Sequence, residues 1–282
     1  MTRVRHLVSV LLLGLAPAPA LPGDAKGKVG EGKEDTLVAA MKFVKVPKGT
    51  FWMGWDSDTK TSKQVEIKQD FELAAYTVTQ EQWEAVMGAG RNPSAFSRQG
   101  KGRDKVKDVS DADLKRFAVE QVSWDDVQVF VKKLNEGEKG KGWTYRLPKE
   151  AEWEYACRGG ATTKEECSFD YYFGKGTNDL SSGEANFNGE VPAGKGAKGP
   201  YLGRPTKVGS YASNKLGLYD MHGNVWQWCE DLYDNTTSAR VMRGGGWNDQ
   251  AWLCRSAYRY GRASVDRGDG LGFRVARVPS GK

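Results

Sequence analysis

Residues 217–228 read Gly217-Leu218-Tyr219-Asp220-Met221-His222-Gly223-Asn224-Val225-Trp226-Gln227-Trp228. Aspartate, asparagine and glycine form tight turns, and they stand here directly before two tryptophans, whose large rings are usually buried. The same mixture recurs along the chain, because 35 of its 282 residues are glycine and 10 are tryptophan. We therefore expect much irregular backbone held together by buried aromatic rings, without long helices dominating the fold.

The composition excludes several classes of protein. Hydrophobic residues make up 39% of the chain and charged residues 28%, which excludes a disordered chain, a collagen or a multispanning membrane protein. The two histidines, His6 and His222, are too few for a zinc site of the His-Glu-x-x-His type. The net charge of +6 comes from basic residues interleaved with acidic ones, so we expect no nucleic-acid binding.

The N-terminus has the three parts of an export signal: basic Arg3 and Arg5, the apolar stretch 7–15, and the small-residue cleavage pattern Ala18-Pro19-Ala20. The apolar stretch is shorter than the ~20 residues of a membrane-spanning helix, so we expect no membrane span. We predict a signal peptide over residues 1–20, a flexible linker over 21–40 and one domain over 41–282. The mature protein would then be secreted or periplasmic.

Capping patterns predict three short helices. Thr79 and Gln82 form a capping box, and Gly88 ends the helix that follows. Ser123 caps a second helix, and we expect its buried stripe to consist of Val127, Phe130, Val131 and Leu134. A third helix would have Pro148 in its first turn and end before Gly159, with these buried residues: Trp153, Ala156 and Cys157.

Short apolar runs over residues 41–46, 65–67, 71–76 and 272–278 have the length of strands. None is followed by a long crossover helix, which disfavours a parallel doubly wound sheet. Glycine- and lysine-rich stretches over 98–107 and 193–200 are expected to be surface loops. These patterns favour an α+β domain with small antiparallel sheets, few helices and long loops.

The motifs occur in a recognisable order. They are Phe51-Trp52-Met53-Gly54, Val78-Thr79-Gln80, Asn92-Pro93-Ser94-x-Phe96, Val119-Glu120-x-Val122-Ser123-Trp124, Tyr145-Arg146-Leu147-Pro148-x-Glu150-Ala151-Glu152-Trp153-Glu154-Tyr155, Ala185-Asn186-Phe187, the stretch 217–228, Arg243-Gly244-Gly245-Gly246-Trp247 and Gly272-Phe273-Arg274. Over about residues 41–278 this order closely resembles the sulfatase-modifying-factor family, whose founding members are formylglycine-generating enzymes. The resemblance implies that family's C-type-lectin-like fold, with small antiparallel sheets, few short helices and much irregular loop.

The resemblance also implies a test for activity. Formylglycine-generating enzymes use a cysteine pair that binds Cu(I) and activates oxygen to oxidise a cysteine of sulfatases. Counted from Gly244-Gly245, the first position holds Asp249 and the second Cys254; counted back from Gly272-Phe273-Arg274, Cys254 falls three residues beyond the second. The pair is absent by either count. Copper is therefore not expected, because a carboxylate is a poor substitute for a soft thiolate.

Cys254 has two interpretations. As a catalytic residue it would be a reactive thiolate whose pKa Arg255 and Arg259 lower. As a structural residue it would be buried or disulfide-bonded, which we favour. An exported protein may pair its cysteines, and three connectivities are open for the set Cys157, Cys167, Cys229 and Cys254.

The resemblance implies structural Ca²⁺ in two loops. The first site would use the Asn186 side chain and the Phe187 carbonyl. The second would use Asp220, the carbonyls of Gly223 and Val225, and the side chain of Gln227, which replaces the family's glutamate. Mixed carboxylate, amide and carbonyl ligands suit Ca²⁺. In the alternative interpretation, Asp220 and Asn224 bond only backbone groups in a turn.

Two further interpretations concern His222 and the tryptophans. His222 could serve as a general base beside Asp220, but we favour a turn residue. Four tryptophans could form a sugar-binding platform, although such clusters are more often core, and they are Trp226, Trp228, Trp247 and Trp252.

Two functions remain open. We favour an exported, monomeric, non-oxidase paralogue that binds a protein or glycan partner, with a sulfatase among the candidate partners. The alternative is a formylglycine-generating oxidase that converts a sulfatase cysteine. The absence of the cysteine pair argues for the first.

Overall fold

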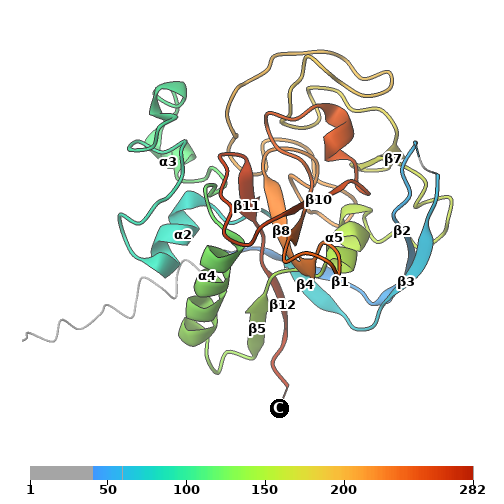
Figure 1. Ribbon diagram of the computed structural model, residues 1–282, viewed down its shortest axis with the longest axis horizontal. Helices are drawn as coiled ribbons and strands as arrows, with labels where there is room; N and C mark the ends of the chain where they lie inside the picture. The colour runs from blue at the N-terminus through green and yellow to red at the C-terminus, as the bar shows by residue number, and fades with distance from the viewer. Residues whose placement is uncertain (1–40, 59, 282) are drawn as a thin grey trace, which may run out of the picture. The chain divides into compact units, whose positions relative to one another are not determined.

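The computed structural model describes residues 41–58 and 60–281 (Figure 1). The strands are β1 (Phe43–Val46), β2 (Gly49–Met53), β3 (Lys63–Ile67), β4 (Phe71–Ala74), β5 (Trp143–Arg146), β6 (Tyr171–Tyr172), β7 (Gly176–Thr177), β8 (Trp226–Leu232), β9 (Arg240–Arg243), β10 (Arg259–Arg262), β11 (Leu271–Phe273) and β12 (Ala276–Pro279). The helices are α2 (Gln80–Met87), α3 (Asp111–Leu114), α4 (Trp124–Gly137) and α5 (Glu150–Cys157), with 3₁₀ turns η1 (Arg103–Lys105) and η2 (Ala251–Cys254). The α+β class is confirmed.

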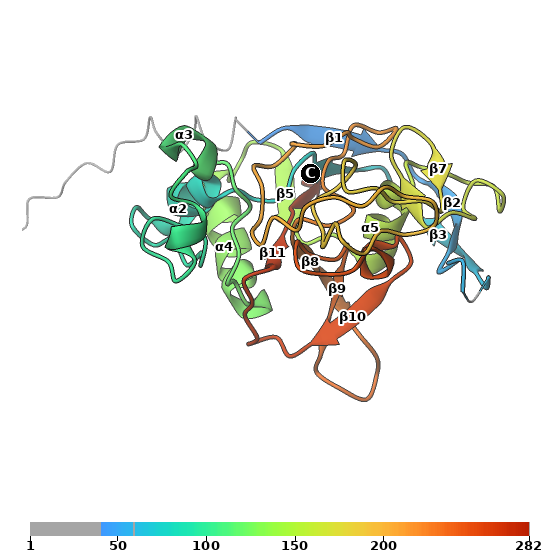
Figure 2. The ribbon, with the colours of Figure 1, turned by 90° about the horizontal axis from the view of Figure 1, so that it is seen from above.

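Two four-stranded sheets organise the domain. The first has the order β1-β4-β12-β5 and is antiparallel throughout. The second has the order β10-β9-β8-β11, and its β11–β8 pair is parallel, which the sequence did not predict. Two hairpins, β2–β3 and β6–β7, complete the strands. In Figures 1 and 2, α2, α3 and α4 lie on one side of the second sheet and the β2–β3 hairpin lies on the other.

The run 272–278 is not one strand, and this expectation was wrong. The chain leaves β11 at Phe273, passes through Arg274 and Val275, and enters β12 in the other sheet. Periodicity cannot reveal the break, because residues 271–276 are all buried. A run that is apolar or buried on both sides of a break has the same pattern as a single buried strand.

The predicted capping box at Thr79 and the predicted N-cap at Ser123 are confirmed. Thr79 Oγ1 accepts a hydrogen bond from the Gln82 N–H (3.3 Å), and Gln82 Oε1 accepts one from the Thr79 N–H (3.0 Å). Ser123 caps α4 in the same manner with Asp126, and all four residues of its predicted stripe are buried. Helix α5 begins at Glu150, after Pro148, because Lys149 is extended and its N–H donates to the Glu152 carboxylate.

Two further expectations from the sequence concern a surface loop and membrane-spanning helices. The predicted surface loop 98–107 contains η1, and α3 follows it. No helix within residues 41–58 and 60–281 is both long and apolar enough to cross a membrane. The predicted signal peptide and linker lie outside the described residues.

Candidate functional site

Five charged side chains form an ionic chain that runs along α5, from Glu150 at its start to Arg158 just after its end, and onto the strands beside it. Arg158 donates to Glu154 Oε1 (2.8 Å), and Arg243 forms an ion pair with Glu154 Oε2. Arg243 Nε lies 3.5 Å from Glu150 Oε1, and Arg259 holds Glu150 with two hydrogen bonds of 2.7 and 2.8 Å. Arg158, Arg243 and Glu154 are fully buried, and the chain reaches solvent at Arg259.

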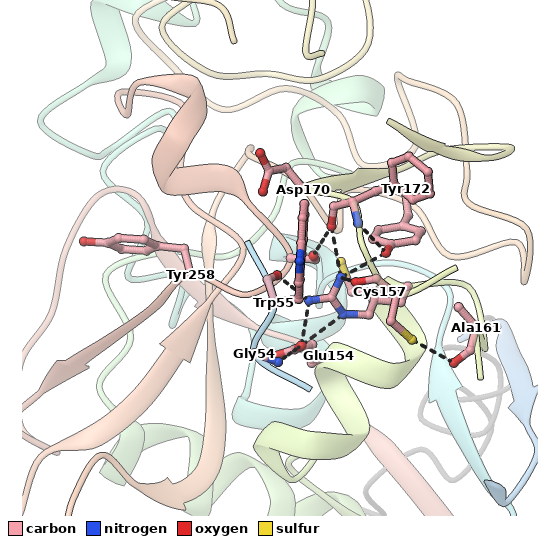
Figure 3. Close-up of polar contacts among 12 residues, drawn as sticks. Gly54, Trp55, Glu154, Cys157, Ala161, Asp170, Tyr172 and Tyr258 are labelled. Carbon is pink, nitrogen blue, oxygen red and sulfur yellow. Dashed lines mark hydrogen bonds and ion pairs between the residues drawn. The ribbon is translucent and has the colours of Figure 1, made fainter. Parts of the chain in front are cut away.

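The ionic chain also fastens the β2–β3 hairpin. The Gly54 N–H donates to Glu154 Oε1 (2.7 Å), and the Trp55 carbonyl accepts from Arg158 (2.8 Å), as Figure 3 shows. Arg158 further donates to the Tyr172 hydroxyl (2.9 Å). The motif that contains Glu150 and Glu154 was recognised in the sequence, but no role was predicted for these residues. Arg158, four positions after Glu154, was a local signal that was missed, whereas Arg243 and Arg259 come from distant segments.

The loop around Asp220 is a tight turn. Asp220 and Asn224 have positive φ angles of 53° and 68°. Gly223 also has a positive φ, and a Cβ atom there would lie 2.3 Å from the Asn186 carbonyl oxygen, so this position requires glycine. Asp220 Oδ2 accepts a hydrogen bond from the Gly209 N–H (2.8 Å). Burial raises the pKa of Asp220 to about 6.

Protein groups engage the side chain of Gln227. Its Oε1 accepts from Trp153 Nε1 (2.7 Å) and Arg274 Nε (2.6 Å), and its Nε2 donates to the Asp220 carbonyl (2.8 Å). Arg274, which is completely buried, also donates to the Tyr219 carbonyl (2.7 Å). Gln227 therefore offers no free oxygen, and these residues do not fit Ca²⁺ as arranged.

Asn186 adjoins the same loop, so the two predicted calcium sites meet. Its carbonyl accepts from the Asn224 N–H (2.7 Å), and its Nδ2 donates to the Arg204 carbonyl (3.0 Å). Its Oδ1 is buried and has no hydrogen-bond partner among the residues that the structure describes. An orphaned buried acceptor fits a cation or a water. Phe187 follows as a buried core residue. Among the described residues, no group of three or more His, Cys, Asp or Glu side chains could hold a metal.

His222 lies in the interior as a structural residue. Its Nε2 accepts from the Tyr172 N–H (2.9 Å), so its Nδ1 carries the proton and donates to the Cys254 carbonyl (2.7 Å). Burial lowers its pKa to about 4. Both ring nitrogens are occupied, which leaves none for the general-base role weighed from the sequence.

All four cysteines are buried and free. Burial raises the pKa of Cys254 well above its ordinary value. Arg255 and Arg259, which the sequence placed near this thiol, pair instead with Asp58 and Glu150. Burial also raises the pKa of Cys157 to about 12. These surroundings suit packing and not a thiolate nucleophile.

Asp249, at the first position of the cysteine pair in one count, supports the aromatic rings. Its Oδ2 accepts from Trp226 Nε1 (2.6 Å) and from the Gly246 N–H (2.8 Å). Burial raises its pKa. The carboxyl is thus committed to two protein donors.

The four tryptophans do not form a common platform. Trp226, Trp228 and Trp247 are buried, whereas Trp252 is 40% exposed. An aromatic face nevertheless exists, because Tyr258 and Tyr260 join the exposed ring. We define the aromatic face as the following residues: Trp226, Trp252, Tyr258 and Tyr260.

The rings of the aromatic face contact one another. The Trp252 and Tyr258 centroids lie 5.3 Å apart, nearly perpendicular. Trp226 lies beneath, 6.1 Å from Tyr258 and 6.3 Å from Tyr260. Tyr260 is 49% exposed. Neither tyrosine was predicted from the sequence. The signal that could have revealed them is their alternation with Arg259 in Arg255-x-Ala257-Tyr258-Arg259-Tyr260, because alternate residues of a strand share one face.

Comparison with known proteins identifies a family, a relative and a solved structure that are similar to this chain. A family model described as "Sulfatase-modifying factor enzyme 1-like domain" matches residues 29–279. "Chaperone protein LppX" of Paenibacillus barcinonensis is 28% identical over 247 residues, which cover 74% of this chain and 80% of that protein. The solved structure of "Treponema denticola variable protein 1" shares the fold, with a TM-score of 0.65 and 23% identity over 84% of this chain and 94% of that one.

Two further relatives have names that differ in the activity they state, since one is called inactive and the other is called an enzyme. "Inactive C-alpha-formylglycine-generating enzyme 2" of Bos taurus is 33% identical over 57% of this chain and 50% of its own length. "Formylglycine-generating enzyme" of Streptomyces coelicolor is 33% identical over 56% of this chain and 52% of its own length. The chain thus spans about half the length of each. The predicted resemblance is confirmed, as is the C-type-lectin-like fold that it implied.

Proposed function

The chain belongs to the sulfatase-modifying factor enzyme 1-like family, and we propose that it is a secreted or periplasmic member without oxidase activity. In this proposal it binds a protein or glycan partner through the aromatic face. The exposed rings of Trp252 and Tyr260, together with the half-buried ring of Tyr258, are the observation that carries the proposal. The names of two relatives, one inactive and one a chaperone, agree with a binding role.

The surroundings of the cysteines support the absence of oxidase activity. Cu(I) sites of this family use two thiolates, and soft sulfur ligands are what Cu(I) prefers. Cys254 is buried as a thiol, and Asp249 is engaged by Trp226 and Gly246. The sequence has no second cysteine beside Cys254 that could supply the other sulfur ligand.

The aromatic face supports binding. Tryptophan and tyrosine bury much area at little entropic cost and carry polar edges, and for this reason they are enriched at interfaces. Val191 is exposed too, and its carbonyl accepts from the Ala251 N–H (3.2 Å), which places it beside Trp252. A contiguous exposed apolar patch on a soluble protein marks an interaction site.

Binding can be tested on immobilised glycans and on peptides that contain Cys-x-Pro-x-Arg. We expect retention of the protein, and its loss in Trp252→Ala and Tyr260→Ala. Val129→Ala, which removes a side chain of similar exposure from α4, is the control. Retention that is equal in all three variants would contradict the use of the aromatic face.

The oxidase alternative has its own test. The purified protein is loaded with Cu(I) and given oxygen and a Cys-x-Pro-x-Arg peptide, and mass spectrometry should detect no aldehyde. Copper-dependent formylglycine that disappears in Cys254→Ser would overturn the proposal. Export is tested separately by N-terminal sequencing, which should start near Leu21; an intact Met1 on cytoplasmic protein would exclude a cleaved signal.

A further inference from the structure

A groove of about 450 Å³ lies between the β2–β3 hairpin and β10. Its lining comes from the hairpin (Met53, Gly54, Thr61, Ser62 and Lys63), from α5 (Glu150 and Glu154), and from Ala257 and Arg259. This volume falls within the range of small-molecule sites, roughly 300–1,000 Å³.

The groove is separate from the aromatic face. Successive side chains of a strand point to opposite sides, so Arg259 points away from the side that carries Tyr258 and Tyr260. Figure 3 shows the Tyr258 ring pointing away from Glu154, which lies on the floor of the groove. A ligand in the groove would therefore bind independently of any partner on the aromatic face.

The carboxylates of the groove are already neutralised. Arg158 and Arg243 pair with Glu154, and Arg259 holds both oxygens of Glu150. A third carboxylate near Arg259 is Asp231, whose Oδ2 accepts from the Glu150 N–H (2.6 Å). The acidic groups therefore stabilise the protein's own donors and leave no free anion facing the groove.

Three donors of the groove remain available. Arg259 is 40% exposed and uses only Nε and Nη2 for Glu150, so its Nη1 edge has no partner in the described part of the chain. Lys63 is exposed and makes no ion pair there. The Ser62 Oγ atom is buried and lacks a hydrogen-bond partner within the same residues. A buried hydroxyl without a partner is uncommon in proteins and indicates a missing group.

We propose that this groove binds a ligand through a carboxylate, which Arg259, Lys63 and the Ser62 hydroxyl hold. A guanidinium edge matches the two oxygens of a carboxylate, and the charge strengthens each hydrogen bond. Met53 and Ala257 supply an apolar wall for the remainder of the ligand. The fold fixes the Arg259 side chain through Glu150 and through the Tyr233 ring, 4.5 Å from the guanidinium carbon, so the charge is held in place before the ligand arrives.

The test uses two small probes that differ only in charge. Glutarate and its neutral diamide are titrated into the isotope-labelled protein, and the NMR signals of residues 61–63 and of the Arg259 side chain are followed. We expect saturable shifts with glutarate that weaken with added salt, and no shifts with the diamide. Equal binding of both probes, or no shift at these residues with glutarate, would overturn the proposal.

Variants locate the site without disturbing the ionic chain. Lys63→Gln should weaken glutarate binding about five- to tenfold, and Ser62→Ala about two- to threefold. Both residues lie outside the buried ion pairs, so the fold should survive. Lys68→Gln, an exposed lysine that does not line the groove, is the matched control. If Lys63→Gln and Lys68→Gln have the same effect, the attraction is general surface charge and the proposed site is wrong.

Discussion

Glu154 and Glu120 are both buried, with 1% and 0% of their surface exposed, yet their surroundings differ completely. Glu154 meets two guanidinium groups and a backbone N–H. Glu120 accepts from the Phe96 N–H (2.9 Å) through Oε1, and its Oε2 has no hydrogen-bond partner within residues 41–58 and 60–281. Burial accordingly raises the pKa of Glu120 to about 8. Equal burial thus produces an ion pair in one region and a neutral acid in the other.

The largest effect is expected at Glu154. Glu154→Gln leaves Arg158 and Arg243 buried without their counter-ion, and losing one partner of a buried pair costs about 3–5 kcal/mol of unfolding free energy. Urea unfolding measures the loss. The control is Glu72→Gln, which removes a half-buried pair with Arg277 and should cost less than about 1 kcal/mol. Similar losses in both variants would show that burial does not set the strength of the pair.

Glu120→Gln should act in the opposite direction. The folded pKa of about 8 lies above the ordinary value of 4.5, so the folded state binds the proton more tightly. The stability that Glu120 contributes is complete below about pH 4.5 and is lost as the pH rises towards 8. A neutral glutamine avoids this loss, and we expect the variant to be more stable than the parent by on the order of 1–3 kcal/mol at pH 8.

The pH dependence provides the check on this prediction. Melting temperatures of the parent and Glu120→Gln are compared across this range. The variant's advantage should grow between pH 5 and pH 8 and stay constant above, following the pKa of about 8. An advantage that does not change with pH would mean that Glu120 is ionised in the folded state, as Glu154 is in its ion pairs.

Cys254 extends the comparison to a buried group that has neither charge nor a close acceptor. Its Sγ lies 4.0 Å from the Gln250 carbonyl oxygen, whereas the Cys157 Sγ lies 3.6 Å from His222 Nε2. Cys254→Ser should cost about 1–2 kcal/mol, and Cys157→Ser a similar amount, because the Tyr172 N–H already occupies the lone pair of His222 Nε2. Thermal unfolding measures both. Rapid alkylation of Cys254 in the folded protein would contradict its assignment as an inert core thiol.

Calcium should give the smallest effect. Asp220 is intermediate between Glu154 and Glu120, since its carboxylate accepts one hydrogen bond from a backbone N–H and burial raises its pKa to about 6. Free Ca²⁺ in the millimolar range should add less than about 1 kcal/mol to the unfolding free energy, because protein donors already engage Gln227 and Asp220 and leave Asn186 Oδ1 as the acceptor for the ion. Because Asn186 Oδ1 is the free acceptor, Asn186→Ala should abolish the calcium-induced rise in melting temperature and Asp220→Asn should not. No difference between chelator and calcium would exclude both predicted sites.

The sequence could predict the features that depend on residues close together in the chain. The capping boxes at Thr79 and Ser123 join residues three positions apart, so their patterns are complete within one turn. The start of α5 was missed by two residues because a proline is acceptable both in and just before the first turn. The break at Arg274 could not be predicted, because the carbonyls that this residue binds belong to residues 74, 75 and 219.

The candidate site shows the same division. The family resemblance placed Gln227 in a ligand set, but its partners Trp153 and Arg274 come from distant segments and occupy its amide oxygen. Composition could not tell the buried Trp228 and Trp247 from the exposed Trp252. The predicted absence of the cysteine pair, in contrast, depends on residue identity at counted positions and not on packing, so the sequence alone was enough to make this prediction.

The passage from β11 through Arg274 to β12 has a consequence for how the protein is made. Strand β12 lies inside the first sheet, between β4 and β5, and β11 completes the second. The segment that fills both places follows every other strand of the two sheets in chain order. Neither sheet can therefore be completed before residues 271–279 have been synthesised, and a translation product that stops before Leu271 lacks a strand in each sheet.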